Sequence, residues 1–154
     1  MLLHARQSAN TLGITLQRIW STLYLSYAEC DARRIDSAHD HAQEALNDAR
    51  ACRMQLSESQ ALRRLARVSA KGESQDSEEP QNLWRQSIEI ATRCGATPSA
   101  GQAQPELGVH FAEIGKEGEA HDLINAALEA FRRMGMPHWV KKTEQAASAW
   151  TLRE

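Results

Sequence analysis

The spacing of apolar residues along the chain is that of helices that each bury one face. Between residues 107 and 135, the stretch LGVHFAEIGKEGEAHDLINAALEAFRRMG carries apolar residues three and four positions apart in two consecutive runs. A polar turn near Gly115 separates the two runs. The chain has only four prolines and eight glycines, and aromatic residues make up 5% of it, a composition that disfavours a β-sheet. We therefore expect an all-α protein.

The same pattern recurs at an interval of about 42 residues, which predicts a helical repeat. Matching positions in the predicted first helices are Leu23, Leu65 and Leu107, and those in the second helices are Ala42, Trp84 and Ile124. The last interval among the second helices is 40 residues, which predicts a deletion of two residues in the third inter-helix turn.

Helix-stop signals agree with this repeat. Gly95 and Gly135 each fall just past an apolar position, where glycine favours a left-handed helix C-cap. Residues 1–13 match only the second helix of a unit, ending at Gly13. The expected units are a partial repeat at 1–13, repeats at 14–54, 55–96 and 97–136, and a capping helix at 137–154.

Gly108 lies inside a predicted helix, where glycine costs about 1 kcal/mol relative to alanine. A packing reason is needed, and we expect the helix that carries Ala120 and Ile124 to approach closely at this point.

These residues resemble the tetratricopeptide repeat family, in which a small residue on the first helix admits a small residue from the second. The third unit matches best, through Leu107, Gly108, Phe111, Gly115, Ala120, Ile124 and Ala127. In the first unit Tyr24 stands at the small position. The resemblance implies a right-handed α-solenoid of antiparallel helix pairs with a C-terminal capping helix. HEAT and armadillo repeats, with periods of about 40 to 47 residues, are the alternatives.

The tail ALEAFRRMGMPHWVKKTEQAASAW is also similar to the C-terminal helices of long-period repeats in large bacterial regulators, such as ATPase-coupled transcription activators and nucleotide cyclases. This likeness implies a second function, that of a regulatory or sensor segment of such a protein.

The net charge limits the class of binding partner, and the cysteine content indicates the redox environment. A net charge of −2 provides no overall positive field for nucleic acid or an anionic membrane. The three cysteines are odd in number and widely spaced, so we expect reduced core thiols in a cytoplasmic protein. The start of the chain, MLLHARQSANTLG, contains too short an apolar run for a signal peptide or a membrane span.

The sequence lacks the motifs that are typical of phosphate-binding or metal sites. The stretch GKEG at 115–118 lacks the rest of a phosphate-binding loop, and His39 and His41 diverge by about 200° on a helix, which is poor for gripping one metal ion. We expect no enzyme activity, no cofactor and no metal. Trp20, Trp84 and Trp139 are expected in the core, whereas Trp150 either covers the last repeat or docks another subunit.

One cluster of basic residues suggests a binding site. Arg63, Arg67 and Lys71 are spaced four apart on a predicted first helix, beside Arg64, and form a basic stripe. In tetratricopeptide arrays the first helices line the concave groove, so an acidic peptide or a carboxylate terminus could dock there. The alternative is a solvated helix face. The candidate partner-binding residues are Arg18, Ser21, Leu25, Arg63, Arg67 and Lys71.

The expected function is therefore that of a non-enzymatic scaffold that binds a protein or peptide in its concave groove. The partial first unit also predicts self-association through the N-terminal end, or a dependence on preceding sequence, because apolar residues there lack a partner helix. These apolar residues are Leu2, Leu3, Ala9 and Leu12.

Overall fold

The computed structural model describes residues 2–72 and 78–151, with side chains described at residue 11, at 13–72 and at 78–148. Within these residues the regular structure is entirely helical, as the sequence predicts. The helices are α1 (Leu2–Asp31), α2 (Ile35–Ala51), α3 (Gln55–Ser69), α4 (Glu79–Arg93), α5 (Thr97–Glu113), α6 (Glu117–Arg133) and α7 (Pro137–Thr151).

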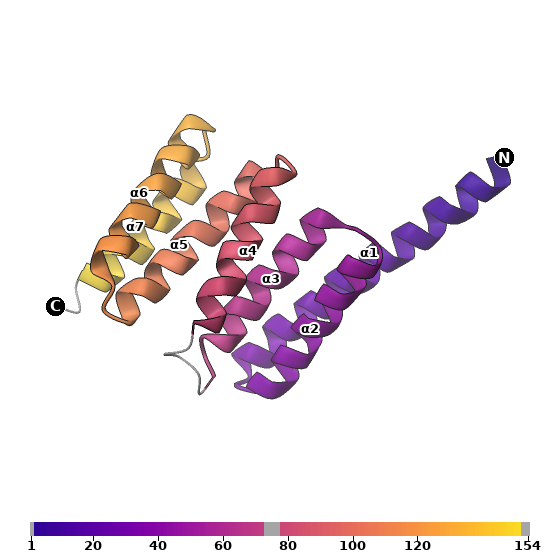
Figure 1. The fold of residues 1–154 in the computed structure, drawn as a ribbon, viewed down its shortest axis with the longest axis horizontal. Helices are drawn as coiled ribbons and strands as arrows, with labels where there is room; N and C mark the ends of the chain where they lie inside the picture. The colour runs from indigo at the N-terminus through magenta and orange to yellow at the C-terminus, as the bar shows by residue number, and fades with distance from the viewer. Residues whose placement is uncertain (1, 73–77, 152–154) are drawn as a thin grey trace.

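Consecutive helices pack against each other in pairs, and the pairs follow one another along the molecule in chain order (Figure 1). The closest pairs are α1 with α2, α3 with α4, and α5 with α6. Weaker contacts join alternate helices, namely α1 to α3, α3 to α5, and α5 to α7. This arrangement is that of a helical repeat.

Tight turns connect most of the helices, and each reverses the chain through a left-handed residue. Gly95 and Gly135 have φ values of 74° and 67°, which confirms the predicted C-caps, and Gly115 has a φ of 78°. Arg33 and Arg53 take the same conformation, with φ values of 61° and 55°, at the ends of α1 and α2. The connection between α3 and α4, residues 70–78, is the longest.

The close contact expected at Gly108 is confirmed. A Cβ at this position would lie 2.9 Å from Ile124 Cγ1 and 3.2 Å from the backbone oxygen of Ala120, so a side chain would push α5 and α6 apart. Gly101, two turns earlier on α5, makes a second approach of this kind that the sequence did not single out. There a Cβ would lie 2.9 Å from Phe131 Cε1.

In the first pair the predicted small position was wrong by two residues. Tyr24 is 66% exposed and does not separate α1 from α2. Ser26 is fully buried instead, and its Oγ donates a hydrogen bond to the backbone oxygen of Ala38 at 2.6 Å. Ser26, Ala66 and Gly108 are therefore the matching positions, 40 and 42 residues apart. The long connection at 70–78 accounts for the extra two residues, so the irregularity is an insertion in the middle pair rather than a deletion in the third.

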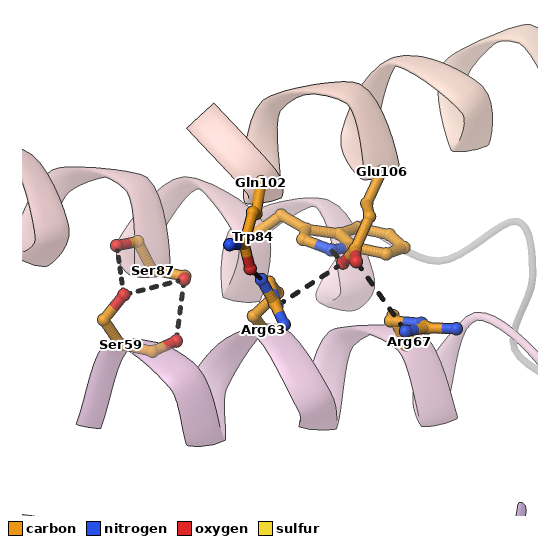
Figure 2. A network of polar contacts seen from close by, with 7 residues as sticks. All are labelled: Ser59, Arg63, Arg67, Trp84, Ser87, Gln102 and Glu106. Atoms are coloured by element: carbon orange, nitrogen blue, oxygen red, sulfur yellow. Dashed lines mark hydrogen bonds and ion pairs between the residues drawn. The ribbon is translucent and has the colours of Figure 1, made fainter. Parts of the chain in front are cut away.

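Small residues also bring α3 and α4 together. Ser59 Oγ donates to the backbone oxygen of Ser87 at 3.0 Å, and Ser87 Oγ donates to the backbone oxygen of Ser59 at 2.7 Å (Figure 2). Both residues are buried, so the reciprocal bonds satisfy hydroxyl groups that would otherwise be costly to bury.

The helix end predicted at Gly13 was also wrong. Gly13 lies inside α1, which runs without interruption from Leu2 to Asp31. The N-terminal part of α1 extends past the other helices (Figure 1). Glycine lowers helix propensity, but its cost of about 1 kcal/mol does not by itself end a helix. The division of the rest of the chain into repeat units stays a prediction.

The helix α7 covers the end of the last pair, contacting both α5 and α6. Its Trp139 ring stacks on the ring of Phe131 with 5.9 Å between centroids, and Thr143 is buried. Val140, Ala146 and Ala147 are half-buried, whereas Lys141, Lys142 and Glu144 are exposed, which agrees with the face expected of a cap.

Other expectations about the core hold in part. Trp84 is buried, but Trp20 and Trp139 are half-buried, and Trp150 lies outside the side chains that the structure describes. All three cysteines are free, and the expectation of core thiols holds for Cys30 but not for Cys94, which is exposed.

No helix among the described residues is long and apolar enough to cross a membrane.

A first prediction follows from the contact at Gly108. Gly108→Leu should lower the free energy of unfolding by roughly 1 to 3 kcal/mol, because the side chain overpacks the α5 and α6 interface. Chemical denaturation followed by circular dichroism measures the change. Gly118→Leu on α6 is the matched control, since no atom lies within 4 Å of a Cβ built there. Equal losses in the two variants would contradict the packing argument.

Candidate functional site

A groove of about 680 Å³ runs along one side of the molecule. Alternate helices contribute most of its lining, and Trp84 reaches it from α4. The lining residues are Tyr27 of α1; Arg63 and Arg67 of α3; Ala70 and Lys71 just beyond it; Trp84; Gln102, Pro105, Glu106, Val109, His110 and Glu113 of α5; and Trp139, Lys142, Thr143 and Ala146 of α7.

Glu106 is the centre of the polar contacts in this groove (Figure 2). Its carboxylate accepts a hydrogen bond from Trp84 Nε1 at 3.2 Å. It also lies 3.8 Å from Arg63 Nε and 3.7 Å from Arg67 Nη1. One carboxylate thus faces two guanidinium groups across the α3 and α5 boundary, and the positive charge of α3 is partly neutralised inside the chain.

Arg63 has a further partner, since its Nη1 donates to the side-chain oxygen of Gln102 (Figure 2). The Arg63 side chain is only 16% exposed, compared with 38% for Arg67. Arg63 is therefore held in place by the protein, whereas Arg67 retains more access to solvent and to a ligand.

The structure brings the three stripe residues Arg63, Arg67 and Lys71 together along the groove. Lys71 differs from the prediction in one respect, because α3 ends at Ser69 and the lysine lies in the turn that follows. Its side chain is exposed, and no ion pair joins it to any described residue.

Arg64 does not belong to this stripe, contrary to the prediction. It is 2% exposed, and its Nε donates to Ser26 Oγ at 2.9 Å. The guanidinium carbon lies 3.9 Å from the centre of the Tyr27 ring. Burial lowers the pKa of Arg64 below its ordinary value. A shift of one position turns a side chain by about 100° on a helix, so the neighbour of Arg63 faces α1 instead of the groove.

The other three candidate residues do not line the groove in the described structure. Arg18 pairs with Asp48 at 2.8 Å, and Ser21 Oγ donates to the backbone oxygen of Gln17 at 2.8 Å. Leu25 is 50% exposed. The cause is the same two-residue error in register that misplaced Tyr24. With Ser26 aligned to Ala66, the α1 residue that matches Arg67 is Tyr27, and Tyr27 does line the groove.

Sequence reasoning missed the groove residues that come from α5 and α7. Lys142 is exposed, and its Nζ lies 4.8 Å from the centre of the Trp139 ring, a cation–π contact. Trp139, Val109 and Ala146 add apolar surface to the lining of the groove. The spacing of Trp139 and Lys142 on one helix face could have shown that they are neighbours, but not that they line the same groove as Arg67.

No group of three or more His, Cys, Asp or Glu side chains within 2–72 and 78–151 could hold a metal ion. Charged and aromatic side chains line the groove.

Among the groove residues that the structure describes, His110 has a pKa that burial shifts. It is 3% exposed, its ring lies 5.2 Å from the Trp84 ring, and its Nε2 has no hydrogen-bond partner among the described residues. Burial lowers the pKa of His110 below its ordinary value of 6.5; Glu113 raises this pKa and Lys116 lowers it further.

A second prediction follows from this shift. Because the folded protein resists protonation of His110, the unfolded chain binds the proton first as the pH falls through 6.5, and the free energy of unfolding should then decrease. His110→Gln should reduce that decrease when urea unfolding is compared at about pH 7.5 and about pH 5.5. The exposed His138→Gln is the control. An unchanged pH dependence in His110→Gln would show that folding does not shift the pKa of His110.

Comparisons with known proteins leave the family open, since no protein-family model matches the chain and a search of curated proteins finds no match. The resemblance to tetratricopeptide repeats therefore stays a prediction.

Proposed function

We propose that this chain is a non-enzymatic scaffold of the tetratricopeptide type, a right-handed α-solenoid that binds an acidic protein segment in its groove. The observation that carries the proposal is the lining of the groove by the alternate helices α1, α3, α5 and α7. In a helical repeat, one helix of each pair faces the inner side and together these helices form an extended binding surface.

The charges in the groove support an acidic ligand. Four cationic side chains, those of Arg63, Arg67, Lys71 and Lys142, face two carboxylates, those of Glu106 and Glu113. The lysines have no ion pair with any described residue, so they are available to bind carboxylates of a partner. Each such contact would be a charge-assisted hydrogen bond.

The apolar residues that line the groove add a second requirement for the ligand. The Trp139 ring lies 4.8 Å from Lys142 Nζ, and Val109 and Ala146 line the same groove. A segment with an apolar side chain next to its acidic residues would bury that side chain here, and burial of apolar surface contributes roughly 25 cal/mol per Å². Charge would then determine orientation and association rate, and the apolar contact would add affinity.

Glu106 is a competitor for the ligand. It occupies the space between Arg63 and Arg67 that a ligand carboxylate would otherwise take. Removing the Glu106 charge should leave Arg67 free to bind a ligand carboxylate, while Gln102 still holds Arg63. A neutral residue at this position should therefore strengthen binding, whereas loss of the cations should weaken it.

The second candidate function is that of a regulatory segment of a larger bacterial ATPase-type transcription activator or nucleotide cyclase. It rests on the likeness of the tail, which spans the C-terminal part of α6 and most of α7. An open frame upstream of Met1 that encodes such a domain would favour this reading. In that case the groove would bind another part of the same protein.

A third prediction tests the groove. Arrays of acidic, neutral and basic peptides are probed with the labelled chain, and acidic peptides that carry an apolar residue should bind best. Combined Arg63→Gln, Arg67→Gln and Lys71→Gln should weaken binding of the best peptide by about tenfold or more, which corresponds to about 1.4 kcal/mol. Glu106→Gln should strengthen it.

Three cations outside the groove provide the matched control. Arg53, Arg93 and Arg133 are exposed, and their replacement by glutamine changes the net charge by the same amount. Circular dichroism verifies helicity in every variant. If the control variant loses as much affinity as the groove variant, general charge rather than the groove explains binding, and the proposed site is wrong.

A further inference from the structure

The polar contacts between α3 and α5 in the groove follow a constant register. Arg63 Nη1 donates to the side-chain oxygen of Gln102, and Arg67 Nη1 lies 3.7 Å from Glu106 Oε1 (Figure 2). Each pair joins residues that are 39 positions apart in the chain. The two pairs are separated by four positions on each helix, so the second pair lies about one helical turn beyond the first.

Continued by one more turn, this register pairs Lys71 with His110. Both residues line the groove. Lys71 lies two positions beyond Ser69, the last residue of α3, but its backbone nitrogen still donates to the backbone oxygen of Val68 at 3.0 Å. The backbone therefore continues to turn as far as Lys71, and the register brings Lys71 and His110 to the same level of the groove.

This third pair differs from the first two because its polar groups have no partner within the described structure. Lys71 is exposed, and no ion pair joins it to a described residue. His110 is 3% exposed, and its Nε2 has no hydrogen-bond partner within 2–72 and 78–151. A buried polar atom without a partner is unfavourable, and a ligand group that bonds to it removes that cost.

A carboxylate matches both unpartnered groups. It can pair with the Lys71 ammonium, and it can accept a hydrogen bond from His110 when the imidazole proton is on Nε2. Burial lowers the pKa of His110, so the ring is neutral at pH 7 and still carries one N–H. Arg67 adds positive charge one turn away. Glu113 opposes an anion, but it is exposed, so water and salt screen its repulsion.

We propose that Lys71 and His110 form a subsite that holds one side-chain carboxylate of the acidic segment bound in the groove. This inference rests on the function proposed above and names the contact that anchors the segment. The pair lies on α3 and α5, between Tyr27 of α1 and Trp139 of α7 in the order of the helices that line the groove. A bound segment can therefore continue on both sides of the subsite, so its occupant is an internal aspartate or glutamate rather than a C-terminal carboxylate.

Titration calorimetry with the acidic peptide that binds best in the array tests the two residues. Lys71→Gln should weaken binding about tenfold, because it removes the ammonium that pairs with the carboxylate. His110→Phe keeps a ring against Trp84 but removes both ring nitrogens, and it should also weaken binding about tenfold. Lys141→Gln is the matched control, since Lys141 is exposed and does not line the groove. It should change the affinity by less than about twofold.

Changes to the same peptide identify the occupant of the subsite. Each acidic residue of the peptide is replaced in turn by its amide. One of these replacements should weaken binding to the wild type but have little further effect on Lys71→Gln or His110→Phe, because residues in contact are energetically coupled. Amidation of the peptide C-terminus should leave the affinity unchanged. In nitrogen-15 NMR spectra, the His110 Nε2 resonance should shift with the acidic peptide and not with that amide form.

The outcomes separate this inference from the proposed function. If acidic peptides bind the wild type and Lys71→Gln equally well, the subsite is wrong and the acidic groove ligand stands. The same holds if only amidation of the peptide C-terminus weakens binding. If no acidic peptide binds, the proposed function is wrong and the subsite falls with it. Lys71 is exposed in a turn, so its variant decides the question even if His110→Phe does not fold.

Discussion

The close approach of two helices through a small residue is the contact on which this fold depends. Gly108 admits Ala120 and Ile124, and Ser26 bonds directly to the backbone at Ala38. At such positions a larger side chain would separate the helices of a pair and shift every contact beyond it. The paired helices can then stack in order, with alternate helices meeting along the groove.

Ser26 joins this packing to the electrostatics of the interior. Its hydroxyl donates to Ala38 and accepts from Arg64, so one buried side chain positions both α2 and α3 against α1. A buried guanidinium is costly unless its hydrogen bonds are satisfied. The Ser26 contacts and the Tyr27 ring offset part of that cost, and Tyr27 in turn lines the groove.

The groove shows how tertiary contacts change the meaning of a charge pattern. A stripe of cations suggests a strong positive surface, but Glu106 lies within 4 Å of two of them. A partner must therefore compete with an internal carboxylate. This arrangement favours ligands that add further contacts at Lys71, Lys142 and the Trp139 ring, because exchange of one carboxylate for another yields little net free energy.

The sequence alone determined the features that depend on local spacing. Helical periodicity, the glycine caps and the need for a close contact at Gly108 were all readable, because each reflects the geometry of one helix or turn. The stripe of Arg63 and Arg67 was readable for the same reason. Only the tertiary structure decided that Ser26 and not Tyr24 is the small position, that α1 continues through Gly13, and that Arg64 is buried. It also decided which α5 and α7 residues meet the stripe, since contacts between helices distant in the chain depend on register and packing that no single helix encodes.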